Sequence, residues 1–269
     1  MKLGKAIATV AGASAGLLLY GALVEVHKLE VTRKRLRLRR WPTALNGLRV
    51  GFLSDFHICD AGTIALTQRA VAKLLEHEPD LILLGGDFVH RWTAESLDQL
   101  EAALGGLANS GGRVFAVPGN RDYLGGYPEL LEPLFRKLGI KLLRNDVAEF
   151  NGVQIVGIDS ANASQADPIG SMELADAEQP TIVLWHEPDL VDWVPDGADL
   201  MLSGHSHGGQ FTTPWGYAPV TSKNGRRYLR GYFPDAATPL YVNRGLGTTG
   251  PPSRLFCRPE VTILDLVQG

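Results

Sequence analysis

Short apolar runs that each end in a polar motif constrain this sequence more than any other feature. Such runs are typical of strands buried on both faces of a sheet. Five runs have this form: Leu48–Ser54, Leu81–Leu84, Arg113–Val117, Thr181–Trp185 and Asp199–Ser203. Because ligands bind at the carboxyl ends of strands in open α/β sheets, we expect the five motifs to meet at one place.

The segments between and after these runs indicate the fold class. The early runs alternate with three expected helices, one around Ile64–Leu75, one opened by Thr93 and reaching Leu107, and one from Pro128 to Gly139. The later half, which begins near Val147 and includes a further run at Val153–Asp159, is richer in strands. Strands interrupted by helices and then followed mostly by strands predict an α/β domain of two packed mixed β-sheets flanked by helices.

The motifs that follow the five runs contain residues that bind divalent cations. They read Asp55-Phe56-His57, Gly86-Asp87, Gly119-Asn120-Arg121-Asp122, His186-Glu187 and Gly204-His205-Ser206-His207. Carboxylates, imidazoles and an amide oxygen suit hard or borderline divalent metals. Each motif alone is more often a turn, a helix cap or a structural histidine. Five in order, each directly after a strand-like run, favour a metal site.

Asp87 is the candidate for a bridging ligand, because a pair of metals about 3.5–4 Å apart needs a shared carboxylate. Three histidines lie outside the motifs, namely His27, His77 and His90, and we expect them in surface or packing positions, with His90 also a candidate for substrate contact. Four aromatic residues near the motifs are candidates for lining a pocket or for packing: Tyr123, Tyr127, Trp215 and Tyr217.

The ordered motifs resemble those of the calcineurin-like metallophosphoesterases, whose pattern is Asp-x-His, Gly-Asp, Gly-Asn-His-Asp/Glu, a lone His and Gly-His-x-His. The resemblance extends over about residues 30 to 268. It implies a calcineurin-like phosphoesterase sandwich with two divalent metal ions, Mn²⁺ most often, with Fe, Zn or Mg as alternatives. The implied ligands are Asp55, His57, Asp87 and His207 for one metal, and Asp87, Asn120, His186 and His205 for the other.

The resemblance also implies catalytic roles for Asp87, Asn120, Arg121 and Asp122, and substrate contacts from Asn120, Arg121 and His186. Arg121 departs from the family pattern, in which many members have histidine at this place. Since arginine stays protonated, it is no ordinary general acid, but it can hold a phosphate oxygen through two donors. We therefore expect a leaving group that needs little protonation, or a proton from elsewhere, with Asp122 orienting Arg121.

The Asn-Arg-Asp variant is similar to that of the UDP-2,3-diacylglucosamine pyrophosphatases of lipid A biosynthesis, which act on a membrane nucleotide lipid. The resemblance implies a two-metal hydrolase of a phosphodiester or pyrophosphate bond, on a lipid-linked substrate such as this one. One alternative is a general phosphodiesterase or phosphomonoesterase that acts on small soluble substrates. A second alternative is a metal-binding scaffold without catalytic activity.

The amino-terminal segment predicts a transmembrane helix. Residues 6–24 contain no charged side chain, and this length spans a bilayer core of about 30 Å. Lys2 and Lys5 followed by small residues also fit a cleavable signal of an exported protein, but the leucines follow the small residues, which favours a retained anchor. We expect residues 1–28 to form the anchor with its basic flank and residues 29–269 to form the phosphoesterase domain.

Basic residues concentrate directly after this segment, seven of them between Lys28 and Arg40. The positive-inside rule then predicts a single-pass protein of the bacterial inner membrane whose domain faces the cytoplasm, with the cluster against anionic headgroups. The alternation of Leu36 and Leu38 with arginines also fits a strand at a sheet edge. From Trp41 onward 27 acidic residues exceed 17 basic ones, which argues against nucleic-acid binding.

Overall fold

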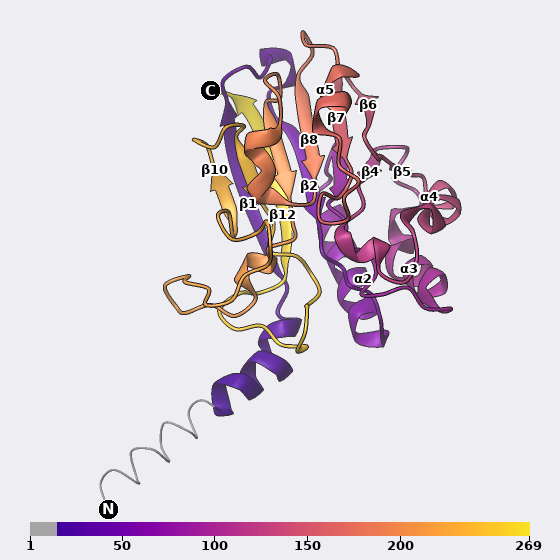
Figure 1. The fold of residues 1–269 in the computed structure, drawn as a ribbon, viewed down its shortest axis with the longest axis vertical. Helices are drawn as coiled ribbons and strands as arrows, with labels where there is room; N and C mark the ends of the chain where they lie inside the picture. The colour runs from indigo at the N-terminus through magenta and orange to yellow at the C-terminus, as the bar shows by residue number, and fades with distance from the viewer. Residues whose placement is uncertain (1–14) are drawn as a thin grey trace, which may run out of the picture.

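The computed structural model describes residues 15–269 and consists of two β-sheets packed face to face with helices outside (Figure 1). The strands of the first sheet are β1 (Glu30–Leu38), β2 (Leu48–Leu53), β3 (Leu81–Leu84), β4 (Val114–Ala116), β5 (Ile140–Leu142) and β12 (Glu260–Gln268). Those of the second are β6 (Asp146–Phe150), β7 (Val153–Ile158), β8 (Thr181–Trp185), β9 (Leu200–Ser203), β10 (Gly231–Phe233) and β11 (Leu240–Val242). The prediction of two packed mixed sheets flanked by helices is confirmed.

The strand order places the ends of the predicted strands together. The first sheet has the order β1-β12-β2-β3-β4-β5 and the second has the order β10-β11-β9-β8-β7-β6. The strands β2 to β5 are parallel, and so are β7, β8, β9 and β11. The carboxyl ends of β2, β3 and β4 therefore share one edge of the first sheet, and those of β8 and β9 share one edge of the second.

The three expected helices occur with different internal divisions, and a further helix, α5 (Pro168–Glu173), was not predicted. The α-helices are α2 (Ala61–Leu75), α3 (Ser96–Leu104), α4 (Glu132–Lys137) and α5 (Pro168–Glu173). The short 3₁₀ segments are η1 (Glu25–His27), η2 (Thr43–Leu45), η3 (Gly105–Leu107), η4 (Asn120–Tyr123), η5 (Pro128–Leu131), η6 (Pro188–Trp193) and η7 (His207–Gly209). Helix α2 begins after Asp60, whose side chain accepts a hydrogen bond from the amide of Thr63 at 2.8 Å. The second expected helix divides into α3 and η3, and the third into η5 and α4.

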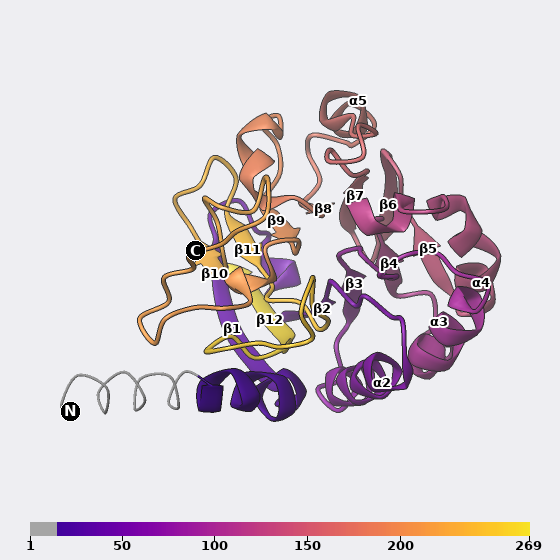
Figure 2. The ribbon, with the colours of Figure 1, turned by 60° about the horizontal axis from the view of Figure 1, so that its bottom comes forward.

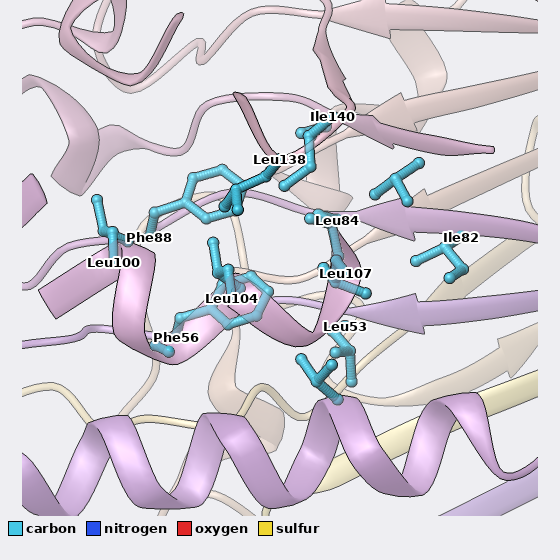
Figure 3. Close-up of a cluster of buried hydrophobic side chains, with 14 of the residues drawn as sticks. Leu53, Phe56, Ile82, Leu84, Phe88, Leu100, Leu104, Leu107, Leu138 and Ile140 are labelled. Carbon is cyan, nitrogen blue, oxygen red and sulfur yellow. The ribbon is translucent and has the colours of Figure 1, made fainter. Parts of the chain in front are cut away.

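Both faces of the first sheet are buried, which explains its continuous apolar strands. Side chains such as Val50 and Phe115 pack against the second sheet. On the opposite face, Leu53 and Leu84 pack against Leu104 and other residues of the helices (Figure 3). The sheet edge that carries the predicted metal-binding motifs is thus held between two packed cores.

The predicted anchor lies partly outside the described residues, since the structure describes it only from residue 15. Residues 15–23 are helical, and within residues 15–269 no helix is both long enough and apolar enough to cross a bilayer. The helix contacts the domain at Gly21, whose carbonyl accepts a hydrogen bond from the amide of Arg254 at 3.3 Å. Leu18, Leu19 and Leu23 remain exposed.

The basic flank forms the edge strand β1. Leu36 and Leu38 are each 1% exposed, and Arg33 forms an ion pair with Asp265 at 2.9 Å, which confirms the prediction of a strand at a sheet edge. The nine residues of β1 extend over roughly 30 Å. The basic side chains are thus spread along the sheet edge, and their contact with headgroups stays a prediction.

Candidate metal centre

The structure brings the seven predicted metal ligands together at the strand ends. Asp55 and His57 follow β2, Asp87 follows β3, Asn120 follows β4, His186 follows β8, and His205 and His207 follow β9. All of them except Asn120 are more than nine-tenths buried. Because these positions come from both sheets, the centre lies across the seam between them.

The ligand atoms form two groups that share one residue. Asp55, His57, Asp87 and His207 form the first group, and Asp87, His186 and His205 form the second, with all ligand atoms of a group within 4.8 Å of one another. The Oδ2 atom of Asp87 lies 3.3 Å from Nε2 of His57 and 3.4 Å from Nε2 of His186. This position between the groups is the one a bridging carboxylate needs.

Several polar atoms at this place are left without ordinary hydrogen-bond partners. Imidazole nitrogens face one another in two pairs, His57 Nε2 with His207 Nε2 at 3.1 Å and His205 Nδ1 with His186 Nε2 at 3.2 Å. Within the described residues, Oδ1 of Asn120 is buried and has no hydrogen-bond partner. Buried polar atoms are normally satisfied, so this set of converging lone pairs fits divalent cations.

Two of the histidines are oriented by hydrogen bonds on their far side. The Nδ1 atom of His186 lies 2.6 Å from the carbonyl oxygen of Gly85, and Nε2 of His205 lies 2.6 Å from that of Lys223. A carbonyl can only accept, so these ring nitrogens carry the protons. The other nitrogen of each ring then presents its lone pair to the centre, as metal-binding histidines do.

The protonation states also suit metal binding. Burial lowers the pKa of His57 to about 3, which keeps the ring neutral at physiological pH. Burial alone would raise the pKa of the Asp87 carboxyl, but a positive charge beside it holds this pKa well below its usual range; a protonated His186 ring supplies such a charge, and a divalent cation would supply it in its place. The other oxygen of Asp87, Oδ1, accepts a hydrogen bond from the amide of Arg121 at 2.7 Å, which fixes the carboxylate.

Five of the seven ligand residues have left-handed backbone conformations. Their φ angles are 52° for Asp55, 48° for His57, 56° for Asp87, 66° for His205 and 51° for His207. Such a conformation costs a non-glycine residue roughly 1 kcal/mol or more, and it clusters at functional sites. The neighbouring glycines permit the close turns, since a Cβ on Gly86 would lie 2.5 Å from the amide nitrogen of Gly119.

Asp122 does not orient Arg121, so that expectation is wrong. Its fully buried carboxylate accepts hydrogen bonds from the amides of Asp87, Phe88, Val89 and Gly119, at 2.8 to 3.2 Å. Burial and the nearby charge of Asp87 raise the pKa of Asp122 to about 7, whereas four amide donors favour the ionised form. Asp122 therefore ties the turn after β3 to the turn after β4.

A pocket of about 490 Å³ opens beside the two ligand groups. Arg121 and His205 contribute to its polar wall, while Phe211 and Val220 contribute apolar surface. Within the described residues, the guanidinium of Arg121 makes no hydrogen bond or ion pair, and its charge adds to the burial that lowers the pKa of His57. An unpaired cation beside a metal centre is suited to a phosphate group.

The three histidines outside the motifs and the four aromatic candidates do not line this pocket. The ring of His90 is 5.7 Å from that of His57, whereas His27 lies on η1 and His77 follows α2. Tyr123 donates a hydrogen bond to Asp159 at 2.7 Å and so supports a loop. The other three aromatic candidates, Tyr127, Trp215 and Tyr217, are exposed.

Two residues that the sequence analysis did not assign support the ligands. Asn243 accepts a hydrogen bond from the hydroxyl of Ser54 at 3.0 Å, and this hydroxyl also lies 2.7 Å from Oδ2 of Asp55. Glu187 accepts a hydrogen bond from the amide of Asn162 at 3.1 Å, and the Asn162 side chain donates at 3.3 Å to the carbonyl of Lys223, which also accepts from Nε2 of His205. The available signals were that Glu187 directly follows His186 and that Asn243 follows an apolar run.

Comparison with known proteins agrees with this fold and this arrangement of residues. The model of the calcineurin-like phosphoesterase family matches residues 48–209, which is more than half of the chain. The chain therefore belongs to the calcineurin-like phosphoesterases, and it is a metallophosphoesterase, as the sequence motifs predicted.

Several relatives match most of the chain. Phosphodiesterase YaeI of Escherichia coli is 34% identical over 226 residues, which cover 81% of this chain and 82% of that protein. The metallophosphoesterase YkuE of Bacillus subtilis is 29% identical, with 92% and 88% covered. UDP-2,3-diacylglucosamine pyrophosphatase LpxG of Chlamydia muridarum is 29% identical, with 90% of each chain covered. The structure of Haemophilus influenzae NAD nucleotidase (NadN) shares the fold at a TM-score of 0.51 and 16% identity, covering 74% of this chain and 45% of the other.

Proposed function

We propose that this metallophosphoesterase hydrolyses a phosphodiester or pyrophosphate bond of a lipid-linked substrate at a membrane, with two divalent cations. The observation that carries the proposal is the pair of ligand groups sharing Asp87, with the unpaired guanidinium of Arg121 in the adjacent pocket. The family gives the reaction class. The pocket and the relatives support the narrower choice of substrate.

The proposed ligands divide between the two metals as the two ligand groups do, with Asn120 added to the second group. Asp55, His57, Asp87 and His207 would hold one metal, and Asp87, Asn120, His186 and His205 the other. When bound, such a pair supplies a nucleophilic hydroxide at neutral pH and neutralises charge on the phosphoryl oxygens. Mn²⁺ is the metal we propose to test first, with Fe, Zn and Mg as alternatives.

The side chains of this pocket would position the phosphate. Arg121 would donate two hydrogen bonds to phosphoryl oxygens, and Asn120 and His186 would contact the substrate beside it. Arg121 provides charge but no transferable proton. A pyrophosphate substrate fits this arrangement, because a departing phosphate group needs little protonation.

Replacing Arg121 with histidine is expected to leave both metals bound and to change the dependence on the leaving group. Histidine can donate a proton to the leaving group. The ratio of kcat/KM for phenolic esters with poor leaving groups to kcat/KM for those with good ones should therefore be roughly tenfold higher in the variant than in the wild type. The measurement is kcat/KM over a series of aryl phosphodiesters. Arg121→Gln is the control, since it removes the charge without adding an acid.

An unchanged slope across the aryl series in Arg121→His would contradict a role for Arg121 near the leaving group. A parallel loss of rate on every ester in both variants would indicate that Arg121 only binds the phosphate.

Similarity to LpxG, a UDP-2,3-diacylglucosamine pyrophosphatase, supports a nucleotide lipid as the substrate. We propose residues 1–28 as a membrane anchor and residues 29–269 as the phosphoesterase domain. The expected location is the bacterial inner membrane with the domain in the cytoplasm, and an exported protein is the alternative. The apolar side chains Phe211 and Val220 in the pocket wall fit an amphiphilic substrate.

Similarity to YaeI, which is named a phosphodiesterase, favours a second candidate, a general phosphodiesterase for small soluble esters. Turnover of UDP-2,3-diacylglucosamine beside a soluble chromogenic phosphodiester, with Mn²⁺ and then with a chelator, separates the two. We expect strong, chelator-sensitive turnover of the lipid and little turnover of the soluble ester. The reverse result would support the general phosphodiesterase and would remove the lipid from the proposal.

A further inference from the structure

The loop between η7 and β10 presents a tryptophan at the tip of a tight turn. In this turn the amide of Gly216 donates a hydrogen bond to the carbonyl of Thr213 at 2.9 Å, and Pro214 occupies the second position. Trp215 is 90% exposed, Tyr217 is 68% exposed and Val220 is 78% exposed. A hydrogen-bonded turn that holds large apolar side chains in water is typical of a surface that contacts a partner.

This loop is joined to the amino-terminal helix through the loop between β11 and β12. The amide of Thr212 donates to the carbonyl of Leu255 at 2.9 Å, and the amide of Arg254 donates to Gly21 of the helix at 3.3 Å. Phe256 follows Leu255, is 40% exposed, and accepts a hydrogen bond at its carbonyl from the Thr212 hydroxyl at 3.0 Å. Figures 1 and 2 both show the helix and these two loops at one end of the molecule.

The charge of the two loops differs from that of the chain. None of the 29 acidic residues falls within residues 210–231 or 245–258, although acidic residues outnumber basic ones in the whole sequence. Residues 210–231 alone contain four basic residues, namely Lys223, Arg226, Arg227 and Arg230. Arg227 is paired with Asp192 of η6, whereas Lys223, Arg226 and Arg230 form no ion pair within residues 15–269, and Arg226 lies beside Tyr217 and Val220. Exposed aromatic side chains next to unpaired basic ones are typical of surfaces that bind anionic bilayers.

We propose that Trp215, Tyr217, Val220 and Phe256, together with the exposed leucines of residues 15–23, form a surface that lies in the headgroup layer of an anionic lipid bilayer. The occupant is a bilayer because the surface continues into the helix, and the sequence before that helix stays uncharged back to residue 6. Aromatic rings in such a loop insert at the depth of the headgroups, while the arginines contact phosphates.

This surface adjoins the opening of the pocket beside the metal ligands. Phe211 and Val220 belong to the same loop and line the pocket that contains Arg121. When the loop lies on the bilayer, the pocket opens at headgroup level, where the phosphate of a lipid-linked substrate is located. This last step rests on the proposed function, whereas the contact between loop and bilayer does not.

The contact is tested by fluorescence quenching of the full chain reconstituted in phosphatidylglycerol-containing vesicles with acyl-brominated lipids. We expect bromolipid to quench the wild type and Trp215→Phe to lose at least about half of that quenching. Trp193, which is 67% exposed on η6, provides the matched control, and Trp193→Phe should keep the quenching. Equal quenching in the wild type and Trp215→Phe would overturn the proposal.

A second measurement separates this inference from the proposed function. The double variant Trp215→Ser, Tyr217→Ser should turn over UDP-2,3-diacylglucosamine in vesicles about fivefold or more slowly, and a soluble chromogenic diester at the wild-type rate. Quenching at Trp215 without any lipid turnover would uphold the surface and reject the lipid substrate. Wild-type lipid turnover by the double variant, with no quenching at Trp215, would reject the surface and uphold the substrate.

Discussion

Replacing Asp87 with alanine is expected to remove both metals and to lower turnover of a chromogenic phosphodiester by about 1,000-fold or more. The reason is that Oδ2 of Asp87 lies between His57 and His186, so its loss affects both ligand groups together. The remaining histidine nitrogens would face one another without the carboxylate that balances the positive charge of the metals. Metal content per chain and kcat, measured on the same preparation, test this expectation.

Asp199→Asn is the matched control for this variant. Asp199 is a buried carboxylate that accepts a hydrogen bond from the amide of Thr181 at 2.9 Å, and it belongs to neither ligand group. The control should keep both metals and most of the activity. A variant at Asp87 that retains two metals and wild-type turnover would refute the bridging role.

Replacing Asp122 with asparagine is expected to lower both the free energy of unfolding and the affinity for metal. An amide offers one oxygen acceptor where the carboxylate offers two, and its NH₂ group would face backbone amides that can only donate. We expect the free energy of unfolding to fall by about 2–4 kcal/mol. The turn that carries Asp87 should loosen, and the affinity for Mn²⁺ should fall about tenfold or more.

Urea denaturation and metal titration measure the two effects, and Arg121→Gln is the comparison. If Asp122 acted by orienting Arg121, both variants would have the same stability and the same metal affinity. The structure instead predicts a loss of stability in Asp122→Asn only. Unchanged unfolding and unchanged Mn²⁺ affinity in Asp122→Asn would contradict the role assigned to its four backbone hydrogen bonds.

The strands that could be predicted from the sequence are those in which every successive side chain is buried. Strands such as Leu81–Leu84 are apolar throughout because the sheet is covered on both faces. The position of β12 could not be predicted, because it pairs with β1 in parallel and with β2 in antiparallel orientation across more than 200 residues of sequence. The short strands β10 and β11 carry too little periodicity to be recognised alone.

The candidate ligands could be found from the sequence because each stands directly after a strand and has a donor atom suited to divalent cations. What the spacing could not provide was the conformation of the turns. Asp55 and His57 are not in an extended segment, because both have positive φ angles. Asp122 follows Arg121 in the chain, but its side chain turns to the amides after the neighbouring strand β3. Such contacts depend on the two strands lying side by side.

Anomalous diffraction from crystals of the Mn²⁺-loaded protein tests whether a pair of metals shares Asp87. The predicted result is two manganese peaks about 3.5–4 Å apart with the Asp87 carboxylate between them, one peak beside His57 and His207 and the other beside His186 and His205. A single peak, or two peaks with Asp87 bound to only one of them, would contradict the bridging role of Asp87.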